Sequence, residues 1–348
     1  MSPKERESKF GMANTVQEPE DQKMIEQNPP ETSPAGGLTA GVWRFLVKYN
    51  TVVIFLVMFL VSGWASDAFF TEKNLFNLLR QVAGLGIIGM GMLLVILTGG
   101  IDLAVGSNLA VGSVLSAYLL GYMPLPAALA LAILICVLLG AASGYLVAGR
   151  NMAPFVATLA LMTISRGLAF IISKGSPIIS TSQALNDFGS AYWLNIPLPV
   201  FLMLVVSAAV FIILHYTVFG RLVIAIGSNE AAVRLAGIRT AYYKFTVYCI
   251  AGGLAAVAGI ISTSRTGVGS PIVGMGFELD AIAAVVIGGG SLSGGRGTAL
   301  NTLLGVFILG MIGNIMNLMN VASYPQQIIK GLIIIAAVLL HGEMRRRK

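Results

Sequence analysis

Few side chains in the apolar part of this chain could do chemistry, and the clearest of them is the carboxyl group of Asp102. It follows Thr98-Gly99-Gly100, three residues that interrupt a long apolar run. A broken helix leaves backbone groups without partners, which a membrane interior tolerates only beside protein or a wet cavity. The break therefore predicts a polar path, in which Asp102, Ser107 and Asn108 would offer hydrogen bonds to hydroxyl groups. Alternatively, Asp102 caps the following helix and only stabilises the bend, because a carboxyl group after two glycines also makes a good N-cap.

A second glycine-rich segment, Val285–Gly297, partly repeats the first, Val95–Gly106. Paired breaks in two halves of a membrane protein often mark its central site. Gly289, Gly290 and Ser291 are therefore further candidates for the same path. The repeat is imperfect, and close packing of helices is an alternative role for these glycines. The segment is not a phosphate-binding loop, because Arg296-Gly297 stands where Lys-[Ser/Thr] is required.

The segment Gly227–Ile238 (GSNEAAVRLAGI) predicts a short helix outside the membrane. Asn229 is a good N-cap, and Gly237 suits the C′ position after the helix. Glu230 precedes Arg234 by four residues, the favourable order for an ion pair on one helix face. Two turns give a helix roughly 10 Å long, which has the form of a docking knob. The candidate docking residues are Ser228, Asn229, Glu230, Ala231, Arg234, Leu235 and Gly237.

Catalysis finds little support in the remaining residues. No HExxH, CxxC or serine nucleophile motif occurs in the sequence. His215 and His341 fall at the ends of apolar segments, where interfacial residues are expected. Cys136 and Cys249 lie in apolar segments without metal or redox spacing. We therefore predict no catalytic residue, no metal site and no cofactor, and we interpret Arg166 as a structural charge near the membrane boundary.

Composition identifies the class of protein. The chain is 56% hydrophobic and 11% charged, whereas soluble domains contain about 25% charged residues. Apolar runs near the length that crosses a bilayer recur from Tyr49 onward. We predict an all-α, polytopic helical membrane protein with about ten transmembrane helices. The predicted spans are 49–68, 78–98, 105–122, 127–148, 154–173, 198–216, 244–264, 281–294, 299–319 and 325–341.

Charge predicts the orientation of these spans. If the N-terminus is inside, the inside connections collect many basic residues and few acids, whereas the outside connections are balanced. Both termini are then cytoplasmic. The net charge of +7 reflects this orientation, and no motif for nucleic-acid binding appears. The inside basic residues are Arg44, Lys48, Arg150, Arg221, Arg234, Arg239, Lys244, Arg296 and Arg345 to Lys348.

The chain divides into three parts by composition. Residues 1–44 are rich in Glu, Gln, Pro, Ser and Thr, which predicts a disordered cytoplasmic N-terminal tail. Residues 45–342 form the transmembrane domain, and residues 343–348 form a basic cytoplasmic tail.

Two outer regions are candidates for contacts with other molecules. Glu278 and Asp280 are predicted in an outside connection, where they could pair with basic groups of a docking protein or remain solvated. The segment Lys174–Pro197 is the longest outside connection and contains Tyr192 and Trp193. Its aromatic residues suit either the lipid interface or a docked protein, and we favour the interface.

Three stretches, Leu97–Ser107, Gly227–Ile238 and Phe277–Gly297, together resemble the permease subunits of ribose-type bacterial ABC importers, which belong to the branched-chain amino acid and ribose permease family. The resemblance runs from about Trp43 to His341, with the motifs in the same order. It implies a multi-pass permease of the bacterial inner membrane with no ATP site of its own.

The resemblance also implies partners: a cytoplasmic ATP-binding subunit, an extracytoplasmic sugar-binding protein and a second permease subunit, identical or different. The Gly227–Ile238 helix would be the element that couples the permease to the ATPase, and the solute would be a monosaccharide. Alternatives are another polar solute, such as a nucleoside, an inositol or a signalling furanone. An ion-coupled secondary carrier is also open, although few ionisable residues lie within the spans.

Overall fold

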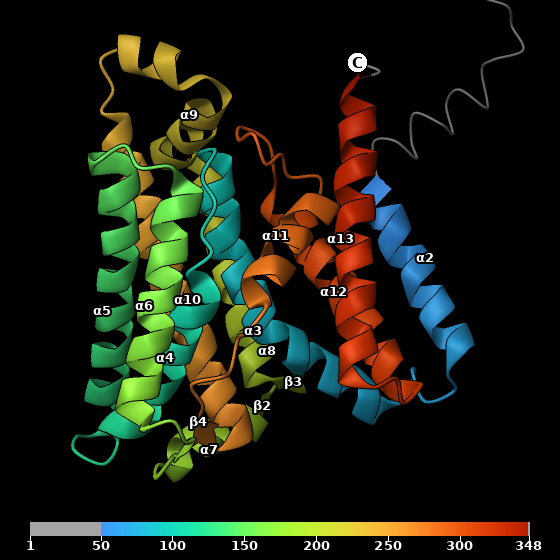
Figure 1. The fold of residues 1–348 in the computed structure, drawn as a ribbon. Helices are drawn as coiled ribbons and strands as arrows, with labels where there is room; N and C mark the ends of the chain where they lie inside the picture. Colours follow the sequence, from blue (N-terminus) through green and yellow to red (C-terminus); the bar gives the residue numbers. More distant parts are fainter. Residues whose placement is uncertain (1–49, 347–348) are drawn as a thin grey trace, which may run out of the picture. The chain divides into compact units, whose positions relative to one another are not determined.

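The computed structural model describes residues 50–346, which fold into a bundle of helices (Figure 1). The predicted tail 1–44 lies outside the described residues. The helices, in chain order, are α2 (Asn50–Ala65), α3 (Glu72–Leu97), α4 (Val105–Leu119), α5 (Leu125–Gly144) with the π-helical turn η3 (Tyr145–Gly149), α6 (Pro154–Ser173), α7 (Gln183–Ser190), α8 (Leu198–Tyr216), α9 (Val218–Leu235), α10 (Thr240–Thr266), α11 (Phe277–Ile287), α12 (Ala299–Leu318) and α13 (Ser323–Arg346).

Four two-residue strands complete the described fold. β1 (Ile178–Ile179) pairs antiparallel with β4 (Val268–Gly269), and β2 (Tyr192–Trp193) pairs antiparallel with β3 (Ile196–Pro197). The β2–β3 turn contains Leu194 and Asn195, both at positive φ, as a type I′ hairpin turn requires.

The core is built on α3 and α10. From Leu85 to Leu97 every residue of α3 is buried, because this stretch is apolar on all faces and packs on all sides. α10 packs against α3, α4 and α5. Small residues let these backbones approach closely: a Cβ added to Gly252 of α10 would lie 3.0 Å from the Cα of Gly140 in α5.

Six helices of the described residues are long and apolar enough to cross a membrane: α3, α5 with η3, α6, α8, α10 and α12. α2 and α4 are shorter apolar helices, and α11 has 11 residues. A full crossing needs about 20 residues, so α4 and α11 each cover only part of the membrane thickness. The predicted span 281–294 is wrong in its second half, since α11 ends at Ile287.

α4 and α11 each follow a non-helical stretch. Residues 98–104 separate α3 from α4, and residues 267–276 separate α10 from α11. We predicted the first break but not the second, although Gly267, Gly269, Pro271, Gly274 and Gly276 mark it in the sequence. The fold thus has breaks at Thr98–Ala104 and Gly267–Gly276, and a further non-helical stretch, residues 288–298, follows α11 and overlaps the predicted segment Val285–Gly297.

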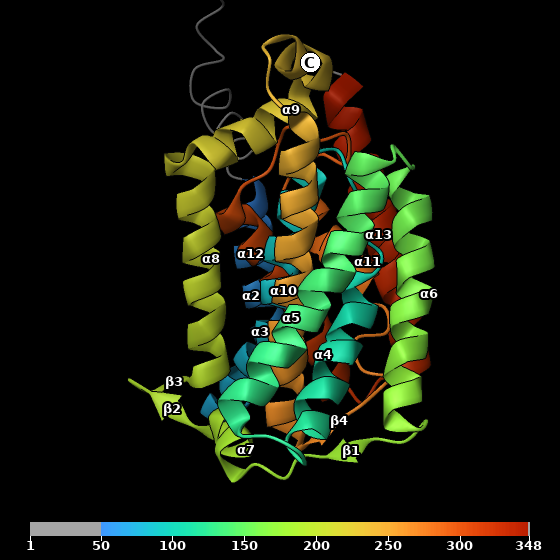
Figure 2. The ribbon, with the colours of Figure 1, turned by 90° about the vertical axis from the view of Figure 1, so that its left-hand side faces the viewer.

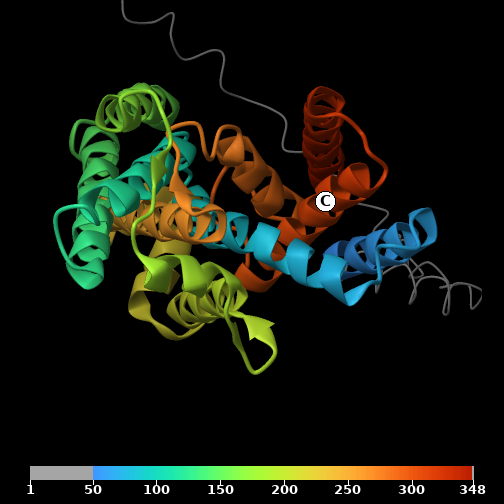
Figure 3. The ribbon, with the colours of Figure 1, turned by 90° about the horizontal axis from the view of Figure 1, so that it is seen from below.

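The two ends of the helical bundle differ. α9 lies across one end, where its last turns stand out beyond the neighbouring helices (Figures 1 and 2). α7 and the four strands gather at the other end. The β2–β3 hairpin projects sideways there, beyond α8 (Figures 2 and 3).

Candidate functional site

The protruding part of α9 begins at a kink. Asn229 has non-helical backbone angles (φ −159°, ψ 90°), so Val218–Leu235 consists of two helical pieces. The side-chain oxygen of Asn229 accepts a hydrogen bond from the Ala232 N–H at 3.0 Å. This bond satisfies one of the free donors at a helix start. The predicted N-cap at Asn229 is confirmed, and the second piece, Glu230–Leu235, is hereafter called the knob helix.

The other end of the knob helix is closed by a Schellman motif. Gly237 has φ +80°, and its N–H donates to the Arg234 carbonyl at 3.0 Å. The Ile238 N–H donates to the Val233 carbonyl at 3.4 Å. These two bonds define the motif and explain the glycine at this position, so the predicted C-terminal cap is confirmed. The knob helix is therefore held in shape by its own sequence at both ends.

Glu230 anchors the knob helix to α10. It pairs with Arg234 at 3.2 Å, as predicted, and with Lys244 at 2.5 Å. The Thr240 hydroxyl donates to the same carboxylate at 3.0 Å. Burial alone would raise the pKa of Glu230, but the hydrogen bond and charge of Lys244, with the hydrogen bonds of Thr240 and Arg234, lower it below its ordinary value. A carboxylate that stays ionised fixes the knob helix in place.

The outer face of the knob helix is free for contact. The Leu235 side chain is 90% exposed, and the Arg234 side chain is 68% exposed. Ala231, Ala232 and Ala236 are exposed as well. Beside them lies a hollow of about 550 Å³, lined by Ala148, Asn151, Arg234, Gly237, Ile238, Arg239, Thr240, Ala241 and Tyr242. An exposed leucine, small neighbours and arginines beside a hollow suit a protein groove with apolar and acidic side chains.

The predicted break at Thr98-Gly99-Gly100 ends α3 with a second Schellman motif. Gly99 has φ +78°. The Gly99 N–H donates to the Ile96 carbonyl at 2.9 Å, and the Gly100 N–H donates to the Val95 carbonyl at 3.2 Å. The helix therefore stops here through local bonds, and the chain turns into the interior of the bundle toward Asp102.

Asp102 is completely buried. One carboxylate oxygen accepts the Ala104 N–H at 2.9 Å, which stabilises the bend, but the N-cap residue of α4 is Ala104. The other carboxylate oxygen has no hydrogen-bond partner among residues 50–346. Both interpretations of Asp102 thus have a structural counterpart: one oxygen supports the backbone and the other remains available.

Ser107 and Asn108 lie in the first turn of α4, and both are buried. The Asn108 side-chain oxygen accepts a hydrogen bond from the Ser165 hydroxyl of α6 at 2.8 Å. Its side-chain nitrogen has no partner within the described part of the chain. Unpaired buried polar atoms are costly in an apolar interior, so those of Asp102 and Asn108 mark this region as a candidate for contact with a polar solute.

Comparison with known proteins covers most of the chain, including the knob helix and the first break. Residues 74–338 match the family described as "Branched-chain amino acid transport system / permease component". The chain belongs to this permease family. It is 41% identical over 304 residues to the ribose import permease protein RbsC of Escherichia coli K12, covering 86% of this chain and 95% of the relative.

Two further relatives widen the comparison. The permease is 45% identical over 291 residues to the ribose import permease protein RbsC of Bacillus subtilis, covering 82% of this chain and 90% of the relative. It is 35% identical over 299 residues to the D-allose transport system permease protein AlsC of Escherichia coli K12, covering 85% and 92%. No solved structure matches the chain.

The remaining candidates of the permease, Gly289, Gly290 and Ser291, lie at the end of α11. Gly289 has φ +82°, and the N–H groups of Gly289 and Gly290 donate to the Val286 and Val285 carbonyls, each at 2.8 Å. This is a third Schellman motif, so the partial sequence repeat reflects two helices that end in the same way.

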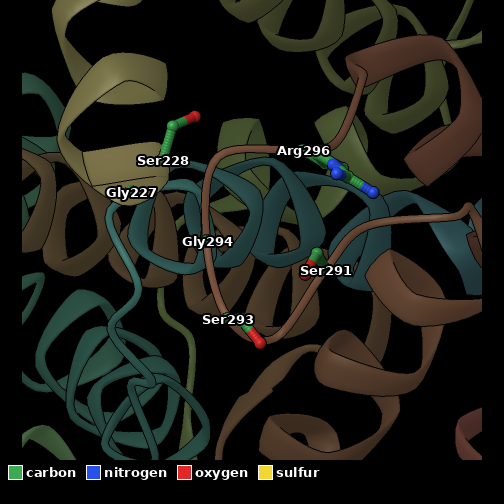
Figure 4. Close-up of a pocket in the computed structure, with 6 residues that line it drawn as sticks. All are labelled: Gly227, Ser228, Ser291, Ser293, Gly294 and Arg296. Carbon is green, nitrogen blue, oxygen red and sulfur yellow. The ribbon is translucent and has the colours of Figure 1, made fainter. Parts of the chain in front are cut away.

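Ser291 lies at a cavity that it shares with Gly227 and Ser228, just before the knob helix. It lines a cavity of about 160 Å³ together with Gly227, Ser228, Ser293, Gly294 and Arg296 (Figure 4). The structure thus brings together Ser228 and Ser291, which sequence motifs placed in two separate candidate groups.

The placement of Glu278 and Asp280 in an outside connection was wrong. Both lie in the first turn of α11. Asp280 is buried and accepts a 2.8 Å hydrogen bond from Lys330 of α13. Glu278 lies against Gly106 in the first turn of α4, and Arg166 of α6 acts on it electrostatically. Asp280 is therefore held inside the permease by α13, and Glu278 is half-buried beside α4; their docking role stays a prediction.

Sequence motifs missed several partners in these clusters. Lys244 and Lys330 lie 14 and 50 residues from the carboxylates that they bind, and Ser165 lies 57 residues from Asn108. Ser165 sits among apolar residues of α6, which was the only available signal. Arg166 donates to the carbonyls of Pro271 and Val273 at 2.7 and 2.9 Å, so it has the predicted structural role and fixes the second break.

Proposed function

We propose that this chain is the membrane-spanning permease subunit of an ATP-driven importer of the bacterial inner membrane, and that its solute is a monosaccharide. Relatives whose names specify ribose, D-allose and L-arabinose cover most of the chain. The observation that carries the coupling role is the knob helix, which is capped at both ends and presents Leu235 and Arg234 to solvent.

In this proposal, the knob helix is the contact through which a separate ATP-binding subunit moves the permease. Leu235 enters an apolar part of the partner's groove, and Arg234 and Arg239 bind acids on its rim. Ser228, Asn229, Glu230, Ala231 and Gly237 hold the helix in position. ATP-driven movement of the partner shifts the knob helix, and the bundle changes between outward- and inward-facing states that bind the partner differently.

The solute path follows the first break. Thr98, Gly99 and Gly100 end α3, and the free atoms of Asp102 and Asn108 offer an acceptor and a donor to sugar hydroxyl groups. Ser107 adds a hydroxyl beside them. A neutral polyol suits such a site because it needs hydrogen bonds but no counter-charge.

The wider assembly completes the proposal. An extracytoplasmic sugar-binding protein delivers the solute at the end that contains α7, and a second permease subunit pairs with this one in the lipid bilayer. Both termini are cytoplasmic, so residues 1–44 and 343–348 are cytoplasmic tails of the transmembrane domain 45–342, with about ten membrane-inserted segments.

Reconstitution tests this function. The permease is placed in liposomes with the ATPase and binding protein encoded beside it, as wild type and as Arg234→Glu. We expect loaded binding protein to stimulate ATP hydrolysis in the wild type and not in Arg234→Glu, because two acids would then repel on the knob helix and reverse its contact with the partner. Arg221→Glu is the matched control, since Arg221 is exposed on α9 before the kink.

The outcomes separate the alternatives. Stimulation that survives in Arg234→Glu would place the coupling contact elsewhere. Solute uptake driven by an ion gradient without the ATPase would overturn the importer proposal altogether.

A further inference from the structure

Three segments that are distant in sequence meet just before the start of the knob helix. They are Gly227 of α9, the end of α3 at Leu97–Gly99, and the loop residues Gly294–Gly295. The Gly295 N–H donates to the Leu97 carbonyl at 3.0 Å. A Cβ added to Gly227 would overlap both the Leu97 oxygen and the Gly295 nitrogen. We call this contact the glycine junction.

Gly294 and Gly295, on the loop side of the glycine junction, are packed as closely as Gly227. A Cβ added to Gly294 would lie 2.9 Å from the Gly227 Cα and 2.9 Å from the Gly99 nitrogen. One added to Gly295 would lie 2.9 Å from the Ser228 Cα. The nearest atom to a Cβ added to Gly295 is the Ser228 hydroxyl oxygen, whereas the atoms nearest to Gly227 and Gly294 are all backbone. The junction is therefore mainly backbone against backbone, and little in it can yield when one segment moves.

The glycine junction connects the knob helix with the first break, Thr98–Ala104. Gly227 lies two residues before the kink at Asn229, where the knob helix begins. Gly99 lies three residues before Asp102, and Gly294 follows the end of α11. A movement of the knob helix thus reaches the base of the break directly, without passing through the core.

We propose that Gly227 is a positioning residue for transport, which holds the part of α9 before the knob helix against the end of α3 and the loop residues Gly294–Gly295, and transmits movement of the knob helix to the solute path. With the glycine junction closed, the end of the path beside the knob helix is shut. When the partner moves the knob helix, Gly227 leaves Leu97 and Gly295, and that end opens. This inference rests on the proposed permease function.

The first test separates the segments by one methyl group. Gly227→Ala is compared with Gly313→Ala, a helical glycine whose added Cβ would meet nothing within 4 Å. In liposomes with ATPase and binding protein, we expect Gly227→Ala to lower the stimulation of ATP hydrolysis about tenfold, since overpacking at a rigid contact disfavours the closed junction. It should also release internal sugar without ATP, whereas Gly313→Ala should behave as wild type.

The second test locks the junction instead. Ser228 and Ser293 are exposed and line the same cavity of about 160 Å³ (Figure 4). Ser228→Cys with Ser293→Cys, in a background without Cys136 and Cys249, is treated with a short bifunctional methanethiosulfonate, which joins the two thiols through disulfide bonds that a reductant cleaves. We expect sugar uptake to stop on cross-linking and to return after reduction. Each variant is compared with its own untreated sample, and the two single-cysteine variants should lose a much smaller fraction of their uptake than the cross-linked pair.

The two tests together keep the inference falsifiable even where Gly227→Ala does not fold. Reversible loss of uptake in the cross-linked pair supports it, because a cross-link across a junction that stays closed during transport would not stop uptake. Undiminished uptake across the cross-link, or wild-type coupling and no sugar release in folded Gly227→Ala, overturns it. A wild type without binding-protein stimulation instead contradicts the proposed function, so the two failures are distinguishable.

Discussion

At the scale of single residues, the carboxylate of Glu230 decides how firmly the knob helix is held. Because hydrogen bonds and Lys244 lower its pKa below the ordinary value of 4.5, its stabilising contribution is fully present above that value. The contribution is lost as pH falls through the lowered pKa of the folded protein. We expect Glu230→Gln to lower stability by about 1 kcal/mol at neutral pH, since the side chain is partly exposed.

Thermal unfolding in detergent across pH 3 to 7 measures this difference. The wild-type and Glu230→Gln melting temperatures should converge at the acidic end of the range. A constant difference between them across the whole range would show that the carboxylate charge does not stabilise the knob helix.

Asp102 gives a second prediction at this scale. Asp102→Asn keeps an oxygen for the Ala104 N–H but replaces the free acceptor by a donor. We expect a stable protein whose sugar uptake falls about tenfold, the effect of one lost hydrogen bond. Uptake assays in liposomes measure it, with Asp187→Asn, an exposed carboxylate of α7, as control. Normal uptake in Asp102→Asn would leave Asp102 with the structural role alone.

At the scale of elements, the caps of the knob helix show what sequence could predict. Asn229 and Gly237 were predictable because a cap bonds to residues a few positions away. The kink that joins the knob helix to the rest of α9 was not predicted, since Val218–Ser228 continues the helical pattern. The Schellman motifs that end α3 and α11 also explain the partial repeat, which local bonding produces without any duplication of the fold.

The Gly237 cap can be tested directly. Gly237→Ala places a Cβ at φ +80°, which costs about 1 kcal/mol in the left-handed region. We expect the amide hydrogens of residues 230–238 to exchange about fivefold faster, with little change elsewhere in the chain. Hydrogen exchange by mass spectrometry measures this, and Gly313→Ala is again the control. Unchanged exchange at the knob helix would mean that tertiary contacts, not the cap, hold it.

The β2–β3 hairpin is the second element, and its location relative to the lipid bilayer can be tested. Tyr192 and Trp193 are each 50% exposed, and Leu194 is 77% exposed. No charged residue occurs from Phe188 to Leu214, and the hairpin projects sideways beyond α8 (Figure 3). Aromatic residues without charges suit the lipid interface better than a soluble partner.

Tryptophan fluorescence reports on this position. The chain has 3 tryptophans, so Trp43→Phe with Trp64→Phe leaves only Trp193. We expect lipids with a quencher near the headgroup to quench Trp193 more than lipids labelled deep in the chain or aqueous iodide. Quenching by iodide alone would place the hairpin in water and favour a docked protein.

At the scale of the whole molecule, the class and family of the protein were predictable from the sequence. The contacts among helices that surround the second break and α11 were not. Composition and apolar lengths identify a polytopic helical protein without any contact between segments. The surroundings of Glu278, Asp280 and Arg166 depend on α4, α6 and α13 meeting around α11, and no local pattern contains that information. Short apolar segments also cannot reveal whether a helix crosses fully, which is why α11 was predicted too long.

The orientation of the bundle is the last consequence. α9 and α7 lie at opposite ends (Figures 1 and 2), and the α9 end carries Arg221, Arg234, Arg239 and Lys244, as the positive-inside rule requires of a cytoplasmic face. In a background without Cys136 and Cys249, an impermeant maleimide should therefore label Ser228→Cys only in inside-out vesicles and Asp187→Cys only in right-side-out vesicles. Both positions are exposed, so access to reagent depends on the side of the membrane alone. Labelling of the two cysteines from the same side would contradict the topology, and with it the cytoplasmic contact on which the coupling role of the knob helix depends.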